Sequence, residues 1–299
     1  MYRSILVPVD GSVLAESALA VAATLAQRSG AELRLVHAHR LTVADELATY
    51  GITGDAARST AEHYVSGLAD RLRAAHGLVV LADVVDGTAA EAIAQHATSV
   101  GSDLIVMTSH GRTGASRFWL GSVADAVMRA ATVPVLIVRG RASATAGSSD
   151  APFARVLVPL DGSAFAEQAL PHAIAFAKLG AAEVHLLRIE EPAESLRTSV
   201  WALAQREPDD LPDRLRRASG ELQTVIERFA SDWAPARPSA EARGAPRVGD
   251  AIAEVAAERG TDLIAMTTHG RGAGRMLIGS VADKVLRGTQ CSVLLLRAR

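Results

Sequence analysis

Two loops of the sequence carry residues that are suited to holding an anionic ligand. Asp10–Ser12 directly follows the apolar run SILVPV, and Ser109–Asp125, SHGRTGASRFWLGSVAD, follows the apolar run DLIVMT. Gly111 and Gly121 bracket nine residues of the second loop. Because glycine has no Cβ, backbone N–H groups can turn toward a phosphate and the phosphate can approach them closely. The pattern indicates either a phosphate-binding loop or a turn between a strand and a helix.

The second loop leads into a predicted helix at Gly121–Val123, where free N–H groups and the positive end of the helix dipole favour an anion. The Ser122 hydroxyl adds a further donor. Arg112 can neutralise phosphate charge as a bidentate donor, and His110 can face the ligand, although a solvated arginine and a structural histidine are the commoner roles. In the first loop, the Asp10 carboxylate can accept hydrogen bonds from an amino group or a ribose hydroxyl.

Both loops also have a purely structural interpretation. Asp10–Ser12 reads Asp-Gly-Ser, which is typical of a turn that caps a helix. Ser122 and Asp125 match the capping-box pattern S-x-x-D, and Ser280 and Asp283 repeat it. A capped helix can still bind a phosphate, so neither interpretation excludes the other.

The sequence lacks the motifs of several other kinds of functional site. There is no G-x-x-x-x-G-K-[ST], no G-x-G-x-x-G after the first apolar run and no G-x-S-x-G, so a P-loop NTPase, a standard dinucleotide site and a serine hydrolase are not expected. No histidine pair has metal-ligand spacing. Cys291 is the only cysteine, which excludes an internal disulfide and a multi-cysteine zinc site. Because no general base accompanies a nucleophile, we predict neither catalytic residues nor a metal site.

The net charge and the hydropathy of the sequence limit the kinds of partner that we expect the protein to bind. The formal net charge is −2, so electrostatics give no reason to expect nucleic-acid binding. No apolar run approaches the roughly 18 residues that span a bilayer. The first predicted strand begins almost at Met1, which leaves no room for a signal peptide. We therefore expect a soluble, cytoplasmic protein with no nucleic-acid or membrane partner.

The sequence contains two copies of one pattern. RSILVPVDGSVLAESAL returns 151 residues later as ARVLVPLDGSAFAEQAL, DLIVMTSHGR returns as DLIAMTTHGR, and GSVADAVMRAATVPVLIVR returns as GSVADKVLRGTQCSVLLLR. The stretch at 140–152, GRASATAGSSDAP, is small and polar, as in a flexible linker. The repeat predicts two tandem domains of one fold, at 1–139 and 153–299.

Each copy alternates apolar runs with helical patterns. In the first copy the runs SILVPVD, ELRLVHA, LVVLADVVDG, DLIVMTS and VPVLIVR are separated by predicted helices, the first of which ends at Gly30. This alternation predicts an α/β fold in which a five-stranded, doubly wound parallel sheet is flanked by helices. Ligands bind such sheets at the carboxyl ends of the strands, where the strand order reverses. The two loops fall at these ends, and their convergence favours the phosphate interpretation.

VPVDGS, DLIVMTSHGR, the G-x₉-G-S loop and the closing VPVLIV together resemble the universal stress protein family in its tandem two-domain form. The resemblance covers nearly all of both halves. It implies a sheet of strand order 3-2-1-4-5 and, in one branch of the family, ATP bound by the motif G-x₂-G-x₉-G-[ST]. It also implies pairing through the last strands, which a tandem chain can make internally between VPVLIVR and SVLLLR as a pseudo-dimer.

The resemblance implies particular site residues. Asp10 would meet adenine or ribose, Val36 would line the adenine pocket, and Gly121 would help to hold the phosphates; Thr108 stands where the motif has its first glycine. The full implied site comprises Pro8, Val9, Asp10, Val36, Met107, Thr108, His110, Gly111, Arg112, Gly121, Ser122 and Val123. The second-domain equivalents are Pro159, Asp161, Leu187, Thr267, Gly270, Arg271, Gly279, Ser280 and Val281.

The second copy departs from the motif because only eight residues separate Gly270 from Gly279. Its site could bind weakly, differently or not at all. We expect a stress-response protein that binds ATP, with or without Mg²⁺, in the first domain and acts as a sensor or switch, with at most slow hydrolysis. The alternative is a protein-interaction module of the same fold that binds no nucleotide. Pairing of whole chains into a homodimer is a further expectation.

Overall fold

The computed structural model describes six stretches of the chain. These are residues 2–40, 56–109, 120–139, 153–192, 210–268 and 279–297.

Strands and helices alternate in both halves of the chain, as the apolar runs predict. The first repeat consists of β1 (Ser4–Pro8), α1 (Val13–Glu16), α2 (Ala18–Ser29), β2 (Glu32–His39), α4 (Ala56–His76), β3 (Val80–Asp86), α5 (Ala89–Ser99), β4 (Leu104–Thr108), α6 (Ser122–Ala130) and β5 (Val135–Val138). The second repeat consists of β6 (Arg155–Pro159), the 3₁₀-helix η1 (Ala166–Ala169), α8 (Leu170–Lys178), β7 (Glu183–Glu190), α9 (Leu211–Arg228), β8 (Arg237–Gly244), α10 (Val248–Glu258), β9 (Leu263–Thr268), α11 (Ser280–Gly288) and β10 (Ser292–Arg297).

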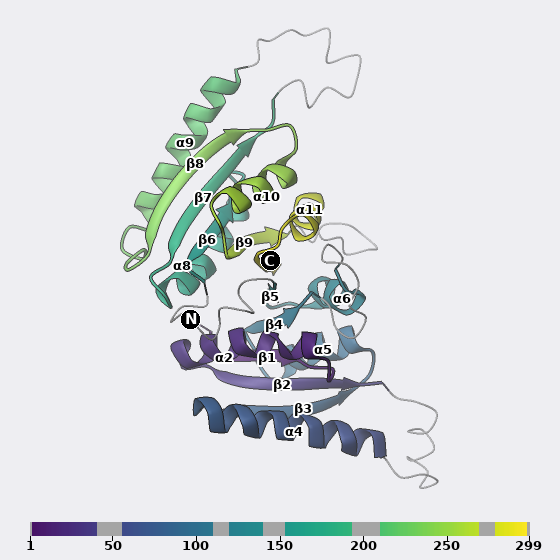
Figure 1. Cartoon of the computed structure of the whole chain (residues 1–299). Helices are drawn as coiled ribbons and strands as arrows, with labels where there is room; N and C mark the ends of the chain where they lie inside the picture. The colour runs from purple at the N-terminus through teal and green to yellow at the C-terminus, as the bar shows by residue number, and fades with distance from the viewer. Residues whose placement is uncertain are drawn as a thin grey trace, which may run out of the picture.

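The ten strands form one continuous sheet in the order β3-β2-β1-β4-β5-β10-β9-β6-β7-β8 (Figure 1). Each repeat has the predicted order 3-2-1-4-5 with parallel neighbours. The two halves join where β5 pairs antiparallel with β10, with Ile137 opposite Val293 and Val135 opposite Leu295. The predicted pseudo-dimer through the last strands is therefore observed.

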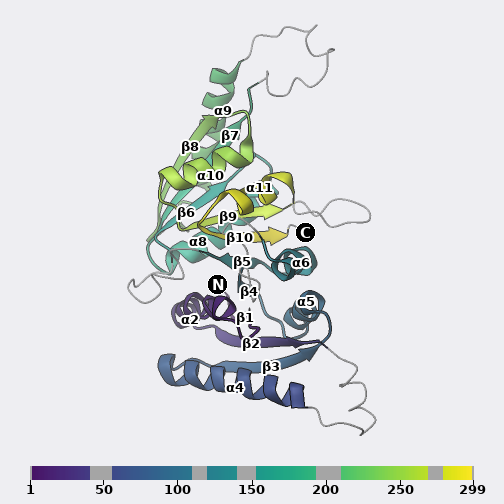
Figure 2. The same ribbon diagram turned by 45° about the vertical axis from the view of Figure 1, so that its right-hand side comes forward.

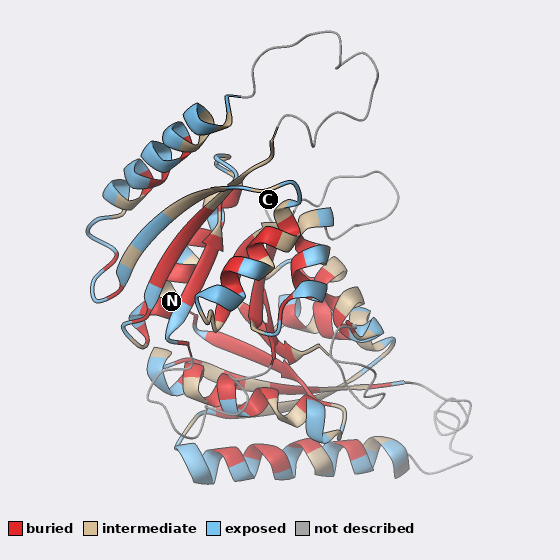
Figure 3. Ribbon diagram, turned by 45° about the horizontal axis from the view of Figure 1, so that its top comes forward, coloured by how far each residue is buried: buried red, intermediate tan, exposed pale blue. Residues whose placement is uncertain are grey.

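The hydrophobic core lies in two layers, one on each face of this sheet. One layer joins residues of α2 and α4 to residues of α8 and α9, and the other joins α5 and α6 to α10 and α11. Both layers run across the boundary between the repeats. The central strands are buried on both faces, whereas the outer sides of α4 and α9 face solvent (Figure 3). Burial on two faces explains why β1 reads as an uninterrupted apolar run.

Two arginines reach across the seam between the repeats in matching positions. Arg139, which follows β5, donates through Nη1 to the carbonyl oxygens of Leu286 and, at 3.1 Å, Thr289 at the end of α11. Arg297, at the end of β10, donates through Nη1 to the carbonyl oxygen of Arg129 near the end of α6 at 3.1 Å. Cations at a helix C-terminus stabilise it, since they meet the unpaired carbonyl groups and the negative end of the dipole. Figure 2 shows α6 and α11 on the same face of the sheet, one in each half.

The buried His185 of β7 predicts a pH dependence of stability. Its Nδ1 lies 2.9 Å from Ser239 Oγ, and burial, then the charge of Arg259, lowers its pKa to about 4 despite the nearby Glu241. In the unfolded chain this histidine takes up a proton near pH 6.5, whereas in the folded chain it does so only near pH 4. The folded state therefore loses stability relative to the unfolded state as the pH drops below 6.5. We expect this group to cost about 2 kcal/mol of unfolding free energy between pH 7 and pH 5.

Urea denaturation of wild type and His185→Gln at the two pH values measures this effect. The variant should lose less stability on acidification than wild type by about that amount. Equal losses in the two proteins would contradict the assignment.

Candidate functional site

A cavity of about 260 Å³ opens at the carboxyl ends of β1 and β4, the place at which the strand order reverses. We call it the first cavity. The described residues that line it are Pro8, Val9, Asp10, Ala15, Ala38, Ala89, Ile93, Met107, Thr108, Ser109, Gly121, Ser122, Val123 and Ala124. The two loops that the sequence singles out therefore meet at one site. Its walls are mostly apolar, and Asp10 is the one charged side chain among these residues.

The turn after β1 is built by Asp10–Ser12. Gly11 has a φ of 81°, a conformation that favours glycine. The Ser12 backbone N–H donates to Asp10 Oδ1 at 2.9 Å, and Ser12 Oγ accepts from the N–H of Ala15 at 3.1 Å, which caps α1. The capping interpretation of this turn is thus confirmed. It places the Asp10 carboxylate at the edge of the cavity.

Tyr64 of α4 supports the same turn from outside. Its hydroxyl donates to Glu16 Oε1 at 2.8 Å. Burial and, next, this bond to the carboxylate raise the pKa of Tyr64 well above its ordinary value. The tyrosine therefore stays protonated and keeps its hydrogen bond throughout the physiological pH range.

The start of α6 forms the other side of the cavity. Gly121 is the N-cap residue, with φ −63° and ψ 147°, and no side chain caps the helix. The Gly121 N–H donates to the Ser109 carbonyl at 2.6 Å, so the two ends of the loop lie against each other. This geometry leaves the first turn of α6, with its unpaired N–H groups and positive dipole end, at the cavity.

The predicted capping boxes are wrong. Ser122 is the first residue inside α6 rather than its cap, and Asp125 instead accepts from Arg129 Nε at 2.8 Å. In the second repeat Gly279 is likewise the N-cap residue without a side-chain cap, and Asp283 pairs with Arg287. A capping box needs its serine at the N-cap, and in both helices a glycine holds that position one residue earlier, which explains why the boxes do not form.

Most predicted residues of the first site come together. Those that line the cavity are Pro8, Val9, Asp10, Met107, Thr108, Gly121, Ser122 and Val123. Val36 is completely buried opposite Pro8 in the sheet and does not line the cavity; Ala38, two residues further along β2, lies there. His110, Gly111 and Arg112 lie outside the described residues.

The lining residues that sequence reasoning missed are small or apolar. They are Ala15, Ala38, Ala89, Ile93, Ser109 and Ala124. Most of these residues contribute to the cavity by leaving space, because their side chains are short, and no sequence motif predicts that space. Ser109 and Ala124 belong to the loop that the sequence singles out, and Ala38 could have been found because it shares a face of β2 with Val36.

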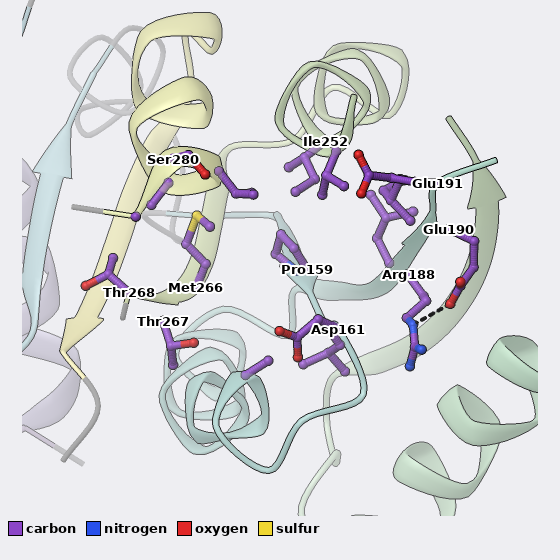
Figure 4. A pocket seen from close by; sticks show the side chains of 18 of the residues that line it. Pro159, Asp161, Arg188, Glu190, Glu191, Ile252, Met266, Thr267, Thr268 and Ser280 are labelled. Atoms are coloured by element: carbon purple, nitrogen blue, oxygen red, sulfur yellow. Dashed lines mark hydrogen bonds and ion pairs between the residues drawn. The ribbon is translucent and has the colours of Figure 1, made fainter. Parts of the chain in front are cut away.

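The second repeat has a larger cavity, of about 670 Å³, in the equivalent place (Figure 4). We call it the second cavity. Its lining includes the predicted Pro159, Asp161, Leu187, Thr267, Gly279, Ser280 and Val281. Gly270 and Arg271 lie outside the described residues. The departure of the second copy from the motif has therefore not closed the cavity.

A charged cluster at the end of β7 distinguishes the second cavity. Arg188 Nε donates to Glu190 at 2.9 Å and its Nη1 donates to Glu221 of α9 at 2.9 Å. Arg214 of α9 lies 3.3 Å from Glu190, and Glu191 is a further lining residue. Sequence reasoning missed this cluster. Aligning LVHAHR of β2 with LLRIEE of β7 reveals the changed residues on the strand, but nothing local predicts that α9 brings in Arg214.

The residues present suit a nucleotide better than a metal ion. Ligand cavities typically measure about 300–1,000 Å³ and combine apolar walls with a few polar groups. At about 260 Å³ the first cavity is slightly smaller than this range, whereas the second, at about 670 Å³, lies well inside it. The helix start suits phosphate, the apolar walls suit a base, and Asp10 suits a ribose hydroxyl. Within the described stretches, no group of three or more His, Cys, Asp or Glu side chains could hold a metal ion.

Fold and cavities together define a tandem α/β protein with a cavity at the switch point of each half. The chain belongs to the universal stress protein family, whose sequence model matches residues 1–139 and 152–297. Among the helices that the structure describes, none is long and apolar enough to cross a membrane.

Individual relatives match either one half or the whole chain. Universal stress protein YxiE of Bacillus subtilis is 31% identical over 154 residues, which cover 46% of this chain and all of the relative. Universal stress protein Rv2005c of Mycobacterium tuberculosis is 38% identical over 142 residues, which cover 46% of each chain. The crystal structure of a universal stress protein from Archaeoglobus fulgidus covers 98% of both chains with a TM-score of 0.72 at 21% identity, and supports the fold alone.

Proposed function

We propose that the first repeat binds an adenine nucleotide, chiefly ATP, and that the protein acts as a nucleotide-dependent sensor or switch in a stress response. The observation that carries this proposal is the position of the α6 N-terminus, GSV, at a cavity formed at the carboxyl ends of β1 and β4. Asp10, on the opposite loop, would accept a hydrogen bond from a ribose hydroxyl or an amino group of the nucleotide. The family resemblance supports ATP over other anions.

No catalytic group is assigned. Asp10 holds the turn through Ser12, and we place it as a binding residue. Hydrolysis, if it occurs, is expected to be slow, because the cavity offers no base beside a nucleophile among its described residues. Mg²⁺ would be bound by the phosphates of the nucleotide, and no site made of protein ligands is proposed for it.

A second candidate function is docking of another protein at the same edge. Large apolar side chains are exposed beside the first cavity, with Val13 86%, Leu14 45% and Val123 41% accessible. Exposed apolar clusters mark interaction sites. In this alternative the two loops are turns that display a protein-binding surface, and the cavity holds no nucleotide.

The test separates these functions directly. The full chain is purified without added nucleotide and denatured, and the released compounds are identified; ATP is also titrated calorimetrically into the native protein. Release of ATP, or saturable binding below millimolar ATP, supports the proposal. No release and no binding at millimolar ATP would overturn it in favour of protein docking.

A further inference from the structure

The second cavity has two chemically different ends. At one end, Gly279 and Ser280 begin α11, so backbone N–H groups and the positive helix dipole face the cavity. At the other end, β7 finishes with Glu190 and Glu191. Figure 4 shows Ser280 and the two glutamates on different sides of the opening. The β7 end carries these two carboxylates together with Arg188 and Arg214, so the two ends offer a ligand different groups.

The two glutamates differ in their partners. The Glu190 carboxylate lies against both Arg188, at 2.9 Å, and Arg214, at 3.3 Å. The carboxylate of Glu191 has no hydrogen bond or ion pair with any residue that the structure describes, and it extends toward Ile252 across the cavity (Figure 4). Arg214 donates instead to the main-chain carbonyl of Glu191, which fixes the backbone from which this side chain projects.

The Glu191 carboxylate lines the cavity and is partly exposed there, so it can accept a hydrogen bond from a bound ligand. A ligand that offers a hydrogen-bond donor or a positive charge at this point gains that interaction. The second cavity is thus equipped for a donor at the β7 end and an anion at the α11 end.

The first repeat lacks this feature. His39 and Arg40 occupy the places of Glu190 and Glu191, 151 residues earlier in the chain. Neither lines the first cavity, where Asp10 is the charged residue among the lining residues that the structure describes. The two cavities are therefore expected to differ in selectivity.

We propose that the second cavity selects a nucleotide whose base carries an amino group, and that Glu191 is the residue that selects it. The proposal rests on the proposed function, in that it takes the cavities of this chain as nucleotide sites. The phosphates lie at the start of α11 and the amino group donates to the Glu191 carboxylate. A base with a carbonyl at the same position presents an acceptor to the carboxylate and is rejected.

The test compares ATP with ITP, in which a carbonyl replaces the adenine amino group. Gly121→Glu blocks the first site, so that calorimetry of this full-length protein reports on the second. A hydrogen bond to a charged group is worth about ten- to hundredfold in affinity, so ATP should bind at least about tenfold more tightly than ITP. Adding Glu191→Ala should bring the ratio close to one by weakening ATP alone, and Glu191→Gln should leave an intermediate ratio.

The matched control uses the other site. In the Gly279→Glu protein, in which the second site is blocked, Arg40→Ala should leave the ATP/ITP ratio unchanged. Thermal unfolding confirms that each variant is folded.

An ATP/ITP ratio that Glu191→Ala does not change, equal binding of the two nucleotides, or no binding to the second site overturns the inference. If the Gly279→Glu protein, whose first site is intact, binds ATP in that case, the proposed function stands without the inference. A selective second site beside a first site that binds nothing would overturn the assignment of nucleotide binding to the first repeat and keep the inference.

Discussion

Replacing Gly121 by glutamate is expected to lower the affinity of the first repeat for ATP by at least about 100-fold, since it places a like charge within a few ångströms of the phosphates in a partly dry site. Gly121 is the N-cap of α6 and lines the first cavity. Its φ of −63° is allowed for any residue, so the substitution need not strain the backbone. The new carboxylate would lie where the anion is proposed to bind.

Calorimetric titration of the full chain measures this loss as a change in both affinity and stoichiometry. Gly67→Glu is the matched control, because Gly67 is an exposed glycine of α4 at which a Cβ would meet nothing within 4 Å. Gly67→Glu should bind ATP like wild type. Unchanged binding by a folded Gly121→Glu protein would place the nucleotide elsewhere.

Replacing Ile137 by aspartate is expected to destabilise the protein by about 4 kcal/mol or more, because it buries an unpaired carboxylate in a packed core. Ile137 lies on β5 opposite Val293 of β10 and is completely buried. It belongs to a core layer that contains residues of both repeats. The damage should therefore reach the whole sheet, and the two repeats should unfold in a single transition.

Urea denaturation tests both statements. Ile137→Val, which removes one methyl group, should cost only about 0.5–1.5 kcal/mol. Val79→Asp introduces the same charge at a side chain that is 65% exposed, and should stay within about 0.5 kcal/mol of wild type. Two well-separated unfolding transitions would contradict the continuity of the core.

The fold could be predicted almost completely, because the information for it is local and repeated. Apolar runs of strand length, buried on both faces, alternate with helical patterns, and the glycine at position 30 ends α2 with a φ of 72°, as the sequence pattern indicates. The seam could be predicted only through the family resemblance. Its arginine contacts, Arg139 to α11 and Arg297 to α6, depend on residues nearly 150 or more positions apart, and no local pattern shows them.

The candidate site could be predicted in part. Gly121 and the Asp10 turn have sequence signatures, and the structure brings both to one cavity. The size of a cavity depends on which short side chains meet, such as Ala38 and Ala89, and that is a result of packing. The capping boxes were predicted wrongly because the pattern S-x-x-D does not show that Ser122 and Ser280 are the first residues inside their helices rather than the N-caps.

The antiparallel pairing of β5 with β10 has a consequence for how the two sites can diverge. A homodimer must carry the same site twice, because both copies are translated from one gene. When the two halves share one chain, the partner strand is always present at a high effective concentration, whatever the protein concentration. Either half can then change its lining residues without losing its partner. Glu190 and Glu191 in one half, against His39 and Arg40 in the other, are differences that a homodimer could not keep.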